Sequence, residues 1–373
     1  MLIFYVFIGI LYLVLMSVLW MNWQTPQRIS PISSTPKVTV LVPFRNEQQN
    51  ISASFHNLKA LQYPDFEIIW IDDFSEDRSL FMLEELIATQ SSPLLSIRII
   101  QSEVIGKKAA LTGGLELSNG EIIMTTDADC LVPKDWISQM TAPFANPEIK
   151  LVAGPVMTDR GLSFFQKFQQ IEWASILAVT QMTFHLKKPL MCSGANLAYR
   201  KSAFLAVRGY EGNLEHLSGD DEFLLKKIIS NFGKNAAVYL HSKDNLVYTQ
   251  EARSWTELFQ QRIRWASKWN VSPSKGHIFA AIAPFLFQLF FLASVGLLFM
   301  GLKGLAVFLF LWLVKLVSER VVLGLVLSSY QIQQKAIDSI LTSLVHPFYV
   351  LTTGLGVLRG KFVWKGRESL PKH

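Results

Sequence analysis

Residues 121–130, EIIMTTDADC, place a short apolar run directly before two aspartates, Asp127 and Asp129. The isoleucines and threonines favour a β-strand over 121–126, which would end at the acidic pair. Further β-rich runs alternate with helical patterns, the strands at 37–42, 66–71, 96–101 and 151–156 and the helices at about 47–61, 78–89 and 107–118. This alternation predicts an α/β fold with a largely parallel sheet.

Charged side chains follow two more of these strands. Ligands of open parallel sheets bind beyond the carboxyl ends of the strands, where Arg45, Asp72 and Asp73 are expected. Adjacent carboxylates repel each other unless a group binds beside them, and a nucleotide base or ribose edge could serve. Alternatively, Asp73 or Ser75 caps the helix that follows.

The acidic pair itself indicates a metal site. Side chains two apart on a strand point to the same side, so Asp127 and Asp129 can hold Mg²⁺ or Mn²⁺ through oxygen ligands. A solvated turn is the alternative. Lys107 lies at a predicted helix start, where exposed N–H groups favour anions, and is a candidate partner for phosphate. Its neighbour Lys108 is equally compatible with a solvent-facing position.

A third acidic segment, Asp220 to Glu222, precedes an apolar run. A carboxylate held there at a helix start could accept a proton from an attacking hydroxyl, and Asp221 and Asp220 are the candidates. An acidic first turn that complements the helix dipole would explain the same charges.

Gln261 and Arg264 lie three residues apart, which places them on one helical face with Trp265 beside them. Arginine can bind a diphosphate through two parallel hydrogen bonds, and tryptophan offers a flat surface to a sugar ring. Arg262 is expected to reach lipid phosphate. The competing interpretation is an amphipathic surface helix without a catalytic role.

Composition indicates a membrane protein, because half of the 373 residues are hydrophobic and residues 1–20 carry no charge. The net charge of +6 is not gathered into a basic block, which excludes a nucleic-acid partner and favours anionic lipid and substrate. The chain has only two cysteines and hence no disulfide framework. We therefore expect an integral protein of the cell (inner) membrane with a cytosolic catalytic domain.

The expected organisation has four parts: an N-terminal transmembrane anchor at 1–24, a cytosolic domain at 36–270, a transmembrane region of two to three segments at 277–358 and a basic tail at 359–373. A cleaved signal peptide is the rival for the first part. Helices at 161–185 and 255–269 lie on the membrane surface or are ordinary buried helices. The middle C-terminal run carries Lys315, Glu319 and Arg320, which are costly in lipid unless paired or facing protein, so this run either crosses or is re-entrant.

Taken together, the motifs resemble the membrane-bound family 2 glycosyltransferases with the GT-A (Rossmann-like) fold, the branch of cellulose, chitin and hyaluronan synthases and ceramide glucosyltransferase. The resemblance covers 36–270 and rests on five motifs in order: VLVPFRNE, IDDFS, TTDAD, SGDDEF and QRIRW. It implies a UDP-sugar donor and a divalent metal as cofactor.

The resemblance also implies a role for each site residue. Asp73, with Asp72, would contact the uracil or ribose, and Arg45 and Lys107 would line the nucleotide site. Asp129 would ligate the metal while Asp127 supports the nucleotide, the donor sugar and the metal. Asp221 would be the general base, with Asp220 standing where the family has glutamate. The segment Ser193–Asn196 with Tyr199 and Arg200 resembles the acceptor side, and Gln261, Arg264 and Trp265 would close over the diphosphate and the acceptor.

The implied reaction is an inverting, single displacement onto a membrane-associated acceptor. A lipid acceptor is favoured over a glycan because the apolar segments are few for a polymer channel. The alternatives are a processive polysaccharide synthase, a nucleotidyltransferase and a non-catalytic membrane scaffold with the same fold.

Overall fold

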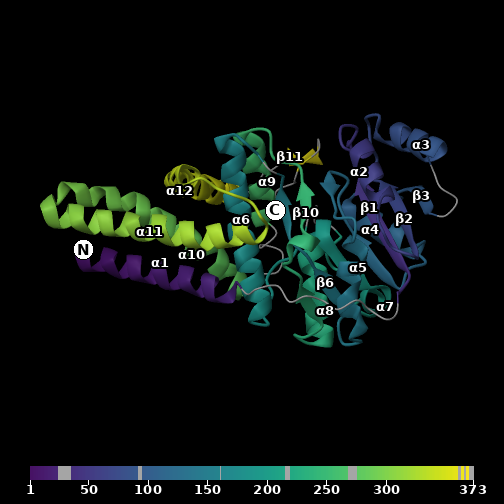
Figure 1. The fold of residues 1–373 in the computed structure, drawn as a ribbon, viewed down its shortest axis with the longest axis horizontal. Coiled ribbons are helices and arrows are strands. Elements are labelled where there is room, and N and C mark those ends of the chain that lie inside the picture. Colours follow the sequence, from purple (N-terminus) through teal and green to yellow (C-terminus); the bar gives the residue numbers. More distant parts are fainter. Residues whose placement is uncertain are drawn as a thin grey trace. The chain divides into compact units, whose positions relative to one another are not determined.

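The computed structural model describes residues 1–23, 35–90, 95–159, 161–214, 219–267, 275–359, 363–364 and 367–368. The chain divides into two compact units: unit 1 is Met1–Gln24, Arg160–Met182 and Glu251–His373, and unit 2 is Thr25–Asp159 and Thr183–Gln250 (Figure 1). The segment 36–270 is thus shared between the units. Most of the linker before residue 36 and most of the basic tail lie outside the described residues.

Unit 2 is built on a seven-stranded sheet with the order β3-β2-β1-β4-β8-β6-β9. Its strands are β1 (Val38–Phe44), β2 (Phe66–Asp72), β3 (Ser96–Gln101), β4 (Ile122–Thr125), β6 (Leu151–Ala153), β8 (Leu197–Arg200) and β9 (Ala237–Tyr239). A smaller sheet, β5-β10-β7, contains β5 (Cys130–Leu131), β7 (Val156–Thr158) and β10 (Val247–Thr249). The helices are α2 (Ile51–Lys59), α3 (Ser79–Gln90), α4 (Lys107–Glu116), α5 (Trp136–Thr141), α7 (Lys201–Ala206) and α8 (Asp220–Phe232), with 3₁₀ turns at η1 (Ala142–Ala145), η2 (Gly194–Asn196) and η3 (Lys243–Asn245).

The predicted α/β class is confirmed. β1, β2, β3 and β4 pair in parallel, so their carboxyl ends share one edge of the sheet. β8 then pairs antiparallel with both β4 and β6. The single strand expected over 151–156 is wrong: β6 ends at Ala153, and β7 belongs to the smaller sheet. Pro155 separates them, and proline has no N–H with which to continue the ladder.

The core of unit 2 packs helices against this sheet. Leu41 of β1, Ile71 of β2, Leu111 of α4 and Leu224 of α8 belong to one buried cluster and are at most 1% exposed. Gly114 lets α4 approach the sheet closely, because a Cβ atom there would lie 2.6 Å from Cδ1 of Ile71. The same packing places the start of α4 at the strand ends.

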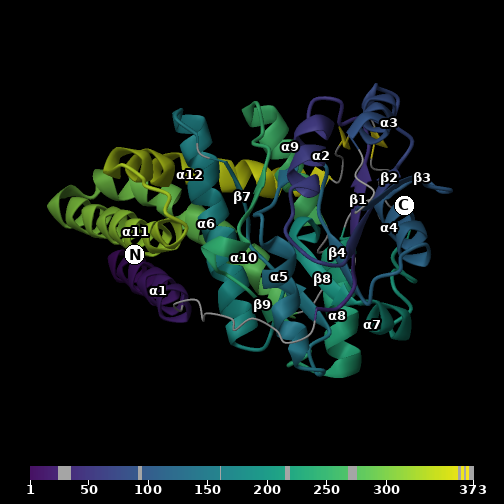
Figure 2. The ribbon, with the colours of Figure 1, turned by 45° about the vertical axis from the view of Figure 1, so that its right-hand side comes forward.

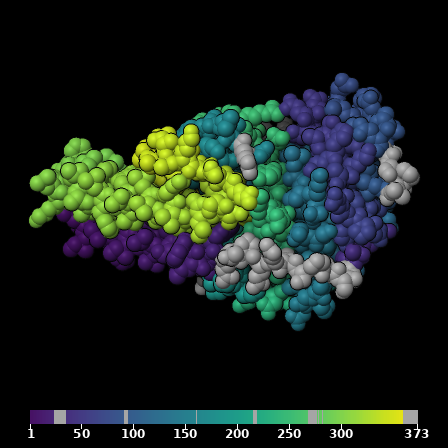
Figure 3. All heavy atoms as spheres, in the orientation of Figure 1, coloured from purple at the N-terminus to yellow at the C-terminus, as the bar shows by residue number. Residues whose placement is uncertain are grey.

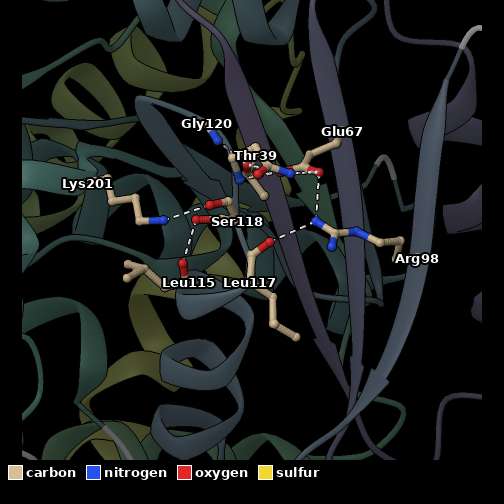
Figure 4. A network of polar contacts seen from close by, with 9 residues as sticks. Thr39, Glu67, Arg98, Leu115, Leu117, Ser118, Gly120 and Lys201 are labelled. Atoms are coloured by element: carbon tan, nitrogen blue, oxygen red, sulfur yellow. Dashed lines mark hydrogen bonds and ion pairs between the residues drawn. The ribbon is translucent and has the colours of Figure 1, made fainter.

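A buried carboxylate ties the opposite end of the parallel strands together (Figure 4). Glu67 of β2 is 3% exposed, and it accepts hydrogen bonds from Thr39 Oγ1 at 2.7 Å and from the Asn119 amide at 2.6 Å. Arg98 Nη2 of β3 lies 2.8 Å from Glu67 Oε2. Burial alone would raise the pKa of Glu67, but the bonds from Asn119 and Thr39 and the charge of Arg98 hold it below its usual value.

Unit 1 is helical. Its elements are α1 (Leu2–Asn22), α6 (Phe164–His185, whose last residues belong to unit 2), α9 (Trp255–Ser267), α10 (Lys275–Ala293), η5 (Ser294–Phe299), α11 (Gly301–Ser329) and α12 (Ala336–Arg359), with short strands β11 (Val363–Trp364) and β12 (Arg367–Glu368). α1 packs along α11 (Figures 2 and 3). Among the described residues, three helical stretches are long and apolar enough to cross a membrane: Leu2–Asn22, Ile278–Phe299 and Ala336–Leu358.

The charged middle run forms one continuous helix of 29 residues, α11. Lys315 of this helix is fully buried and pairs with Glu319, which also accepts hydrogen bonds from Tyr12 of α1 and Ser343 of α12. Two of the three charges expected to be costly are therefore paired and face protein, the condition under which such charges are tolerated.

The Glu67 network predicts a pH-dependent loss of stability. At pH 7, Glu67→Gln should lower the free energy of unfolding by about 1–3 kcal/mol, because it removes the charge of a buried acceptor that Thr39, Asn119 and Arg98 contact. A lowered folded pKa adds stability that is present above the unfolded value and is lost as pH falls through the folded pKa. The difference between the variant and the unchanged protein should therefore shrink as the pH falls below about 4.5.

Denaturant unfolding in detergent from pH 7 to pH 3 measures this difference. Glu121→Gln is the matched control, because the carboxylate of Glu121 is 61% exposed in its pair with Arg200. A difference that stays constant over this pH range would contradict the prediction.

Candidate functional site

The site is built at the carboxyl ends of the parallel strands, where β1, β2 and β4 are followed by Arg45, Asp73 and Asp127. Because parallel strands end at one edge, residues more than 80 positions apart in the chain are carried to the same place. The expected positions of these residues at strand ends agree with the structure.

The loops after β1 and β2 hold each other through Arg45. Its guanidinium donates to the carbonyl oxygens of Asp73, at 3.1 Å, and Phe74, and it pairs with Glu76 at 2.8 Å. Phe74 has a positive φ of 58°, and the bond from Arg45 helps to hold this unusual backbone conformation. Arg45 therefore shapes the loop in addition to any contact with a nucleotide.

The adjacent aspartates after β2 are buried, at 1% and 2% exposure. Asp72 Oδ1 accepts from the Ser75 amide at 3.0 Å, and Asp73 Oδ1 accepts from the Gly106 amide at 2.8 Å. Neither Asp73 nor Ser75 caps α3, so that alternative is wrong. Instead, Asp77 accepts from the amide of Ser79, the first residue of the helix, at 2.9 Å. Asp73 thereby joins the end of β2 to the turn before α4, and Asp72 holds the loop after β2.

The first residue of α4, Lys107, lies between carboxylates from two other elements. Its Nζ is 2.5 Å from Asp127 Oδ1, after β4, and 3.7 Å from Asp220 Oδ2, at the start of α8. Burial alone would lower the pKa of Lys107, but the charges of Asp127 and Asp220 raise it above its usual value. The lysine is therefore charged at pH 7, and its side chain is 20% exposed. Its neighbour Lys108 is buried, with its Nζ donating to the Asn213 carbonyl oxygen at 2.7 Å, so Lys108 does not face solvent.

Asp221, the second residue of α8, is held by backbone amides. Its Oδ2 accepts from the Gly194 amide at 3.1 Å and its Oδ1 from the Glu222 amide at 2.8 Å. The structure brings Asp220 and Asp221 to Lys107 and Asp127, although about 90 residues separate α8 from β4 in the chain. Asp220 is engaged by the lysine, whereas Asp221 is oriented by amides.

Asp127 and Asp129 are accompanied by Cys130, and the ligand atoms of all three lie within 4.8 Å of one another. Burial, then the charge of Asp129, raises the pKa of the Cys130 thiol well above its usual value, so it stays neutral at pH 7. Asp129 Oδ2 is also 3.5 Å from Thr249 Oγ1 of β10. A donor set of carboxylate oxygens suits a hard divalent cation such as Mg²⁺ or Mn²⁺ better than a soft one.

Gly194 lies at the centre of this arrangement, and sequence reasoning placed it only in a resembling acceptor segment. A Cβ atom there would lie 2.9 Å from Asp220 Oδ2 and 3.5 Å from Lys107 Nζ. Its carbonyl accepts from Thr125 Oγ1 at 2.6 Å. Asn196 anchors the segment, since its side chain donates to the carbonyl oxygens of Pro155 and Asn245 and accepts from Trp136 Nε1.

The remaining candidates, Gln261, Arg264 and Trp265, lie on α9 in unit 1. Arg262 does not reach outward to lipid phosphate as expected, because it is 5% exposed and pairs with Glu172 of α6. α9 is therefore no isolated surface helix. Periodicity misses this because α9 is amphipathic in either case.

Comparison with known proteins agrees with the fold. A solved mannosyltransferase, PcManGT from Pyrobaculum calidifontis in complex with GDP-Man and Mn²⁺, is 18% identical and superposes with a TM-score of 0.55 over 95% of each chain. Poly-β-1,6-N-acetyl-D-glucosamine synthase of Staphylococcus epidermidis is 25% identical over 238 residues, which are 61% of this chain and 53% of the relative. β-Monoglucosyldiacylglycerol synthase of Trichormus variabilis is 28% identical over 236 residues, 62% of this chain and 49% of the relative.

These matches define the class as a GT-A glycosyltransferase fold with apolar helices, which confirms the resemblance found in the sequence. The chain matches the model of glycosyl transferase family 21 over residues 1–369 and belongs to that family. It spans about half the length of the curated relatives that it matches.

The contacts of Gly194 predict that Gly194→Ala impairs the site without unfolding the protein. The added methyl group forces the Asp220 carboxylate to shift by a few tenths of an ångström, and such displacements cost about tenfold or more in rate. Gly113→Ala in α4 is the control, since a Cβ atom there meets nothing within 4 Å. Initial rates of glycosyl transfer and the unfolding temperature in detergent should be measured for both. Equal rates for the two variants would contradict the prediction.

Proposed function

We propose that this protein transfers a sugar from a UDP-sugar, with inversion at the anomeric carbon, to a lipid acceptor at a membrane. The observation that carries the proposal is the meeting of Lys107 with Asp127 and Asp220, beside Asp221. A cation and hard oxygen ligands would face a nucleotide diphosphate, and Asp221, oriented by backbone amides, would accept a proton. Membership of glycosyl transferase family 21 supports this assignment.

The donor would lie over the strand ends. Asp72 and Asp73 would contact the uracil or ribose, and Arg45 would hold the loop that carries them. Asp129, with Asp127, would hold the divalent cation, which supplies positive charge to the departing diphosphate. Lys107 supports the proposal because the neighbouring carboxylates raise its pKa, so it is charged at pH 7.

Asp221 would be the general base, removing the proton from the acceptor hydroxyl as that oxygen attacks the anomeric carbon and UDP departs. The two backbone amides on its carboxylate orient it, whereas Asp220 is held by Lys107. The orientation of Asp221 by these amides supports its assignment as the base. Gln261, Arg264 and Trp265 of α9 would bind the diphosphate and the acceptor.

A lipid acceptor fits the three candidate membrane helices of the described chain. A relative at 28% identity, β-monoglucosyldiacylglycerol synthase, bears the name of a lipid-directed enzyme. Another, at 25%, is named for a polysaccharide, so processive synthesis is the second candidate. We propose that the catalytic unit lies on the cytosolic side of the inner membrane, because basic residues follow the first apolar helix and neither cysteine is in a disulfide.

Purified protein in bilayer discs, incubated with labelled UDP-sugars and Mg²⁺ or Mn²⁺, tests the proposed activity. We expect UDP release that requires acceptor lipid, product that organic solvent extracts, and loss of activity on chelation that either metal reverses. Product retained as polymer would identify a processive synthase. Pyrophosphate release would indicate a nucleotidyltransferase, and absence of turnover with every donor would indicate a scaffold.

The assignment of the base predicts that Asp221→Asn abolishes transfer, by about 10²–10⁴-fold, because the amide cannot accept the proton. Calorimetry should find UDP·Mn²⁺ binding nearly unchanged. Asp220→Asn is the comparison, and it should weaken nucleotide binding through its pair with Lys107. Unchanged turnover in Asp221→Asn would show that another group is the base, and an α-linked product from an α-linked donor would exclude inversion.

A further inference from the structure

Arg262 of α9 is buried, yet it lies next to Gln261 and two positions before Arg264, both assigned to the diphosphate. All three of its guanidinium nitrogens have partners. Nε donates to Glu172 Oε1 at 2.8 Å, Nη2 donates to Glu172 Oε2, and Nη1 donates to Gln261 Oε1. The pair with Glu172 is thus bidentate, a geometry that fixes the plane of the guanidinium as well as its position.

The plane of the guanidinium also positions an aromatic ring. Its central carbon lies 4.2 Å from the centre of the Trp265 ring and 5.3 Å from that of Trp173. The two indoles are 5.2 Å apart and inclined at 68°. Trp265 is therefore held by a cation on one side and by the neighbouring indole of α6.

Glu172 is the origin of this chain of contacts. It is 7% exposed, lies on α6, and also accepts from the Tyr349 hydroxyl of α12 at 2.9 Å. Burial alone would lower the pKa of Arg262, but the charge of Glu172 raises it, so the guanidinium stays charged. One carboxylate thereby fixes a segment of α9 from two other helices.

The pair between Arg262 and Glu172 joins α9 to α6, and this packing does not require the hydrogen bond from Arg262 to Gln261. Neighbouring residues on a helix do not face each other, so the Gln261 side chain is turned toward Arg262 to accept its hydrogen bond. Once Oε1 accepts this hydrogen bond, the amide nitrogen is the group of the Gln261 side chain that can donate to a ligand. A donor is what a phosphoryl oxygen requires.

We propose that Glu172 is a positioning residue for glycosyl transfer. Through Arg262 it orients the Gln261 amide as a donor to the nucleotide diphosphate and holds Trp265 in place. This inference rests on the proposed function, in which Gln261 and Trp265 act on the diphosphate and the acceptor. Glu172 itself touches neither substrate.

The test uses the full chain in detergent, with UDP·Mn²⁺ and uridine as probes and UDP-sugar turnover as the second readout. Glu172→Gln keeps the shape of the side chain but removes the charge that fixes Arg262. We expect UDP affinity and kcat/KM to fall about tenfold, as for other small misplacements of a binding group, while uridine affinity stays constant. Glu257→Gln, an exposed acid on the same helix, is the matched control and should leave all three unchanged.

A double-mutant cycle separates positioning from simple docking. In a Gln261→Ala background, Glu172→Gln should cause little further loss of UDP affinity, because its effect passes through the missing amide. Arg262→Lys retains a positive charge for Glu172 but cannot donate the two parallel hydrogen bonds of a guanidinium. It should therefore fold with an unchanged unfolding temperature and still lose UDP affinity. This variant carries the test if Glu172→Gln does not fold.

Losses that add fully in the double variant, or an unchanged UDP affinity in both Glu172→Gln and Arg262→Lys, would overturn the inference. The proposed function fails in a different way, when the unchanged protein itself transfers no sugar from any donor. UDP affinity is measured in either case, so the two failures are distinguishable.

Discussion

The ammonium group of Lys107 is the contact on which the site depends, because it allows carboxylates from separate elements to lie together. Asp127 follows β4 and Asp220 begins α8, and like charges so close would repel each other in a partly buried site. The lysine is carried there by the first turn of α4, which packs against the sheet through Leu111. The lysine is therefore already oriented before any substrate arrives.

The backbone around Gly194 forms the second part of this arrangement. Its amide holds Asp221, its carbonyl is held by Thr125 at the end of β4, and Asn196 fixes the following turn to two other segments. The candidate base is consequently positioned by main-chain groups, which have little freedom to move once the sheet is formed. The antiparallel strand β8 continues directly from this turn, so the register between β4 and β8 determines where Gly194 lies.

Much of this arrangement was predictable from residue patterns. The parallel strands and the acids at their ends were found because an apolar β-rich run followed by a charge is a local signal, visible in EIIMTTDADC. The strand β8 was missed because its four residues, LAYR, become a strand only by pairing with β4 and β6. The part of the site that β8 positions therefore depends on tertiary strand pairing. The β-propensity of a four-residue segment does not predict such pairing.

The inward orientation of Arg262 was missed for a related reason. On an amphipathic helix rich in arginine, periodicity does not distinguish a buried cation from one that faces solvent or lipid. Glu172, the acid that decides the matter, lies 90 residues earlier in the chain. Cys130 was passed over because a single cysteine carries no spacing signal, and only the folded strand shows its thiol beside Asp127 and Asp129.

The polar contact between α1 and α11 has a consequence for biosynthesis. Tyr12 donates to Glu319, which lies 307 residues later, so the first helix meets this partner only after nearly the whole chain has been made. Until then the Tyr12 hydroxyl lacks this acceptor, and its ring can contact only the earlier helix α10, through Phe287 and Phe291. Completion of the helical unit is thus a late event in synthesis, and a ribosome stalled before residue 319 would leave an unfinished bundle for quality control to recognise.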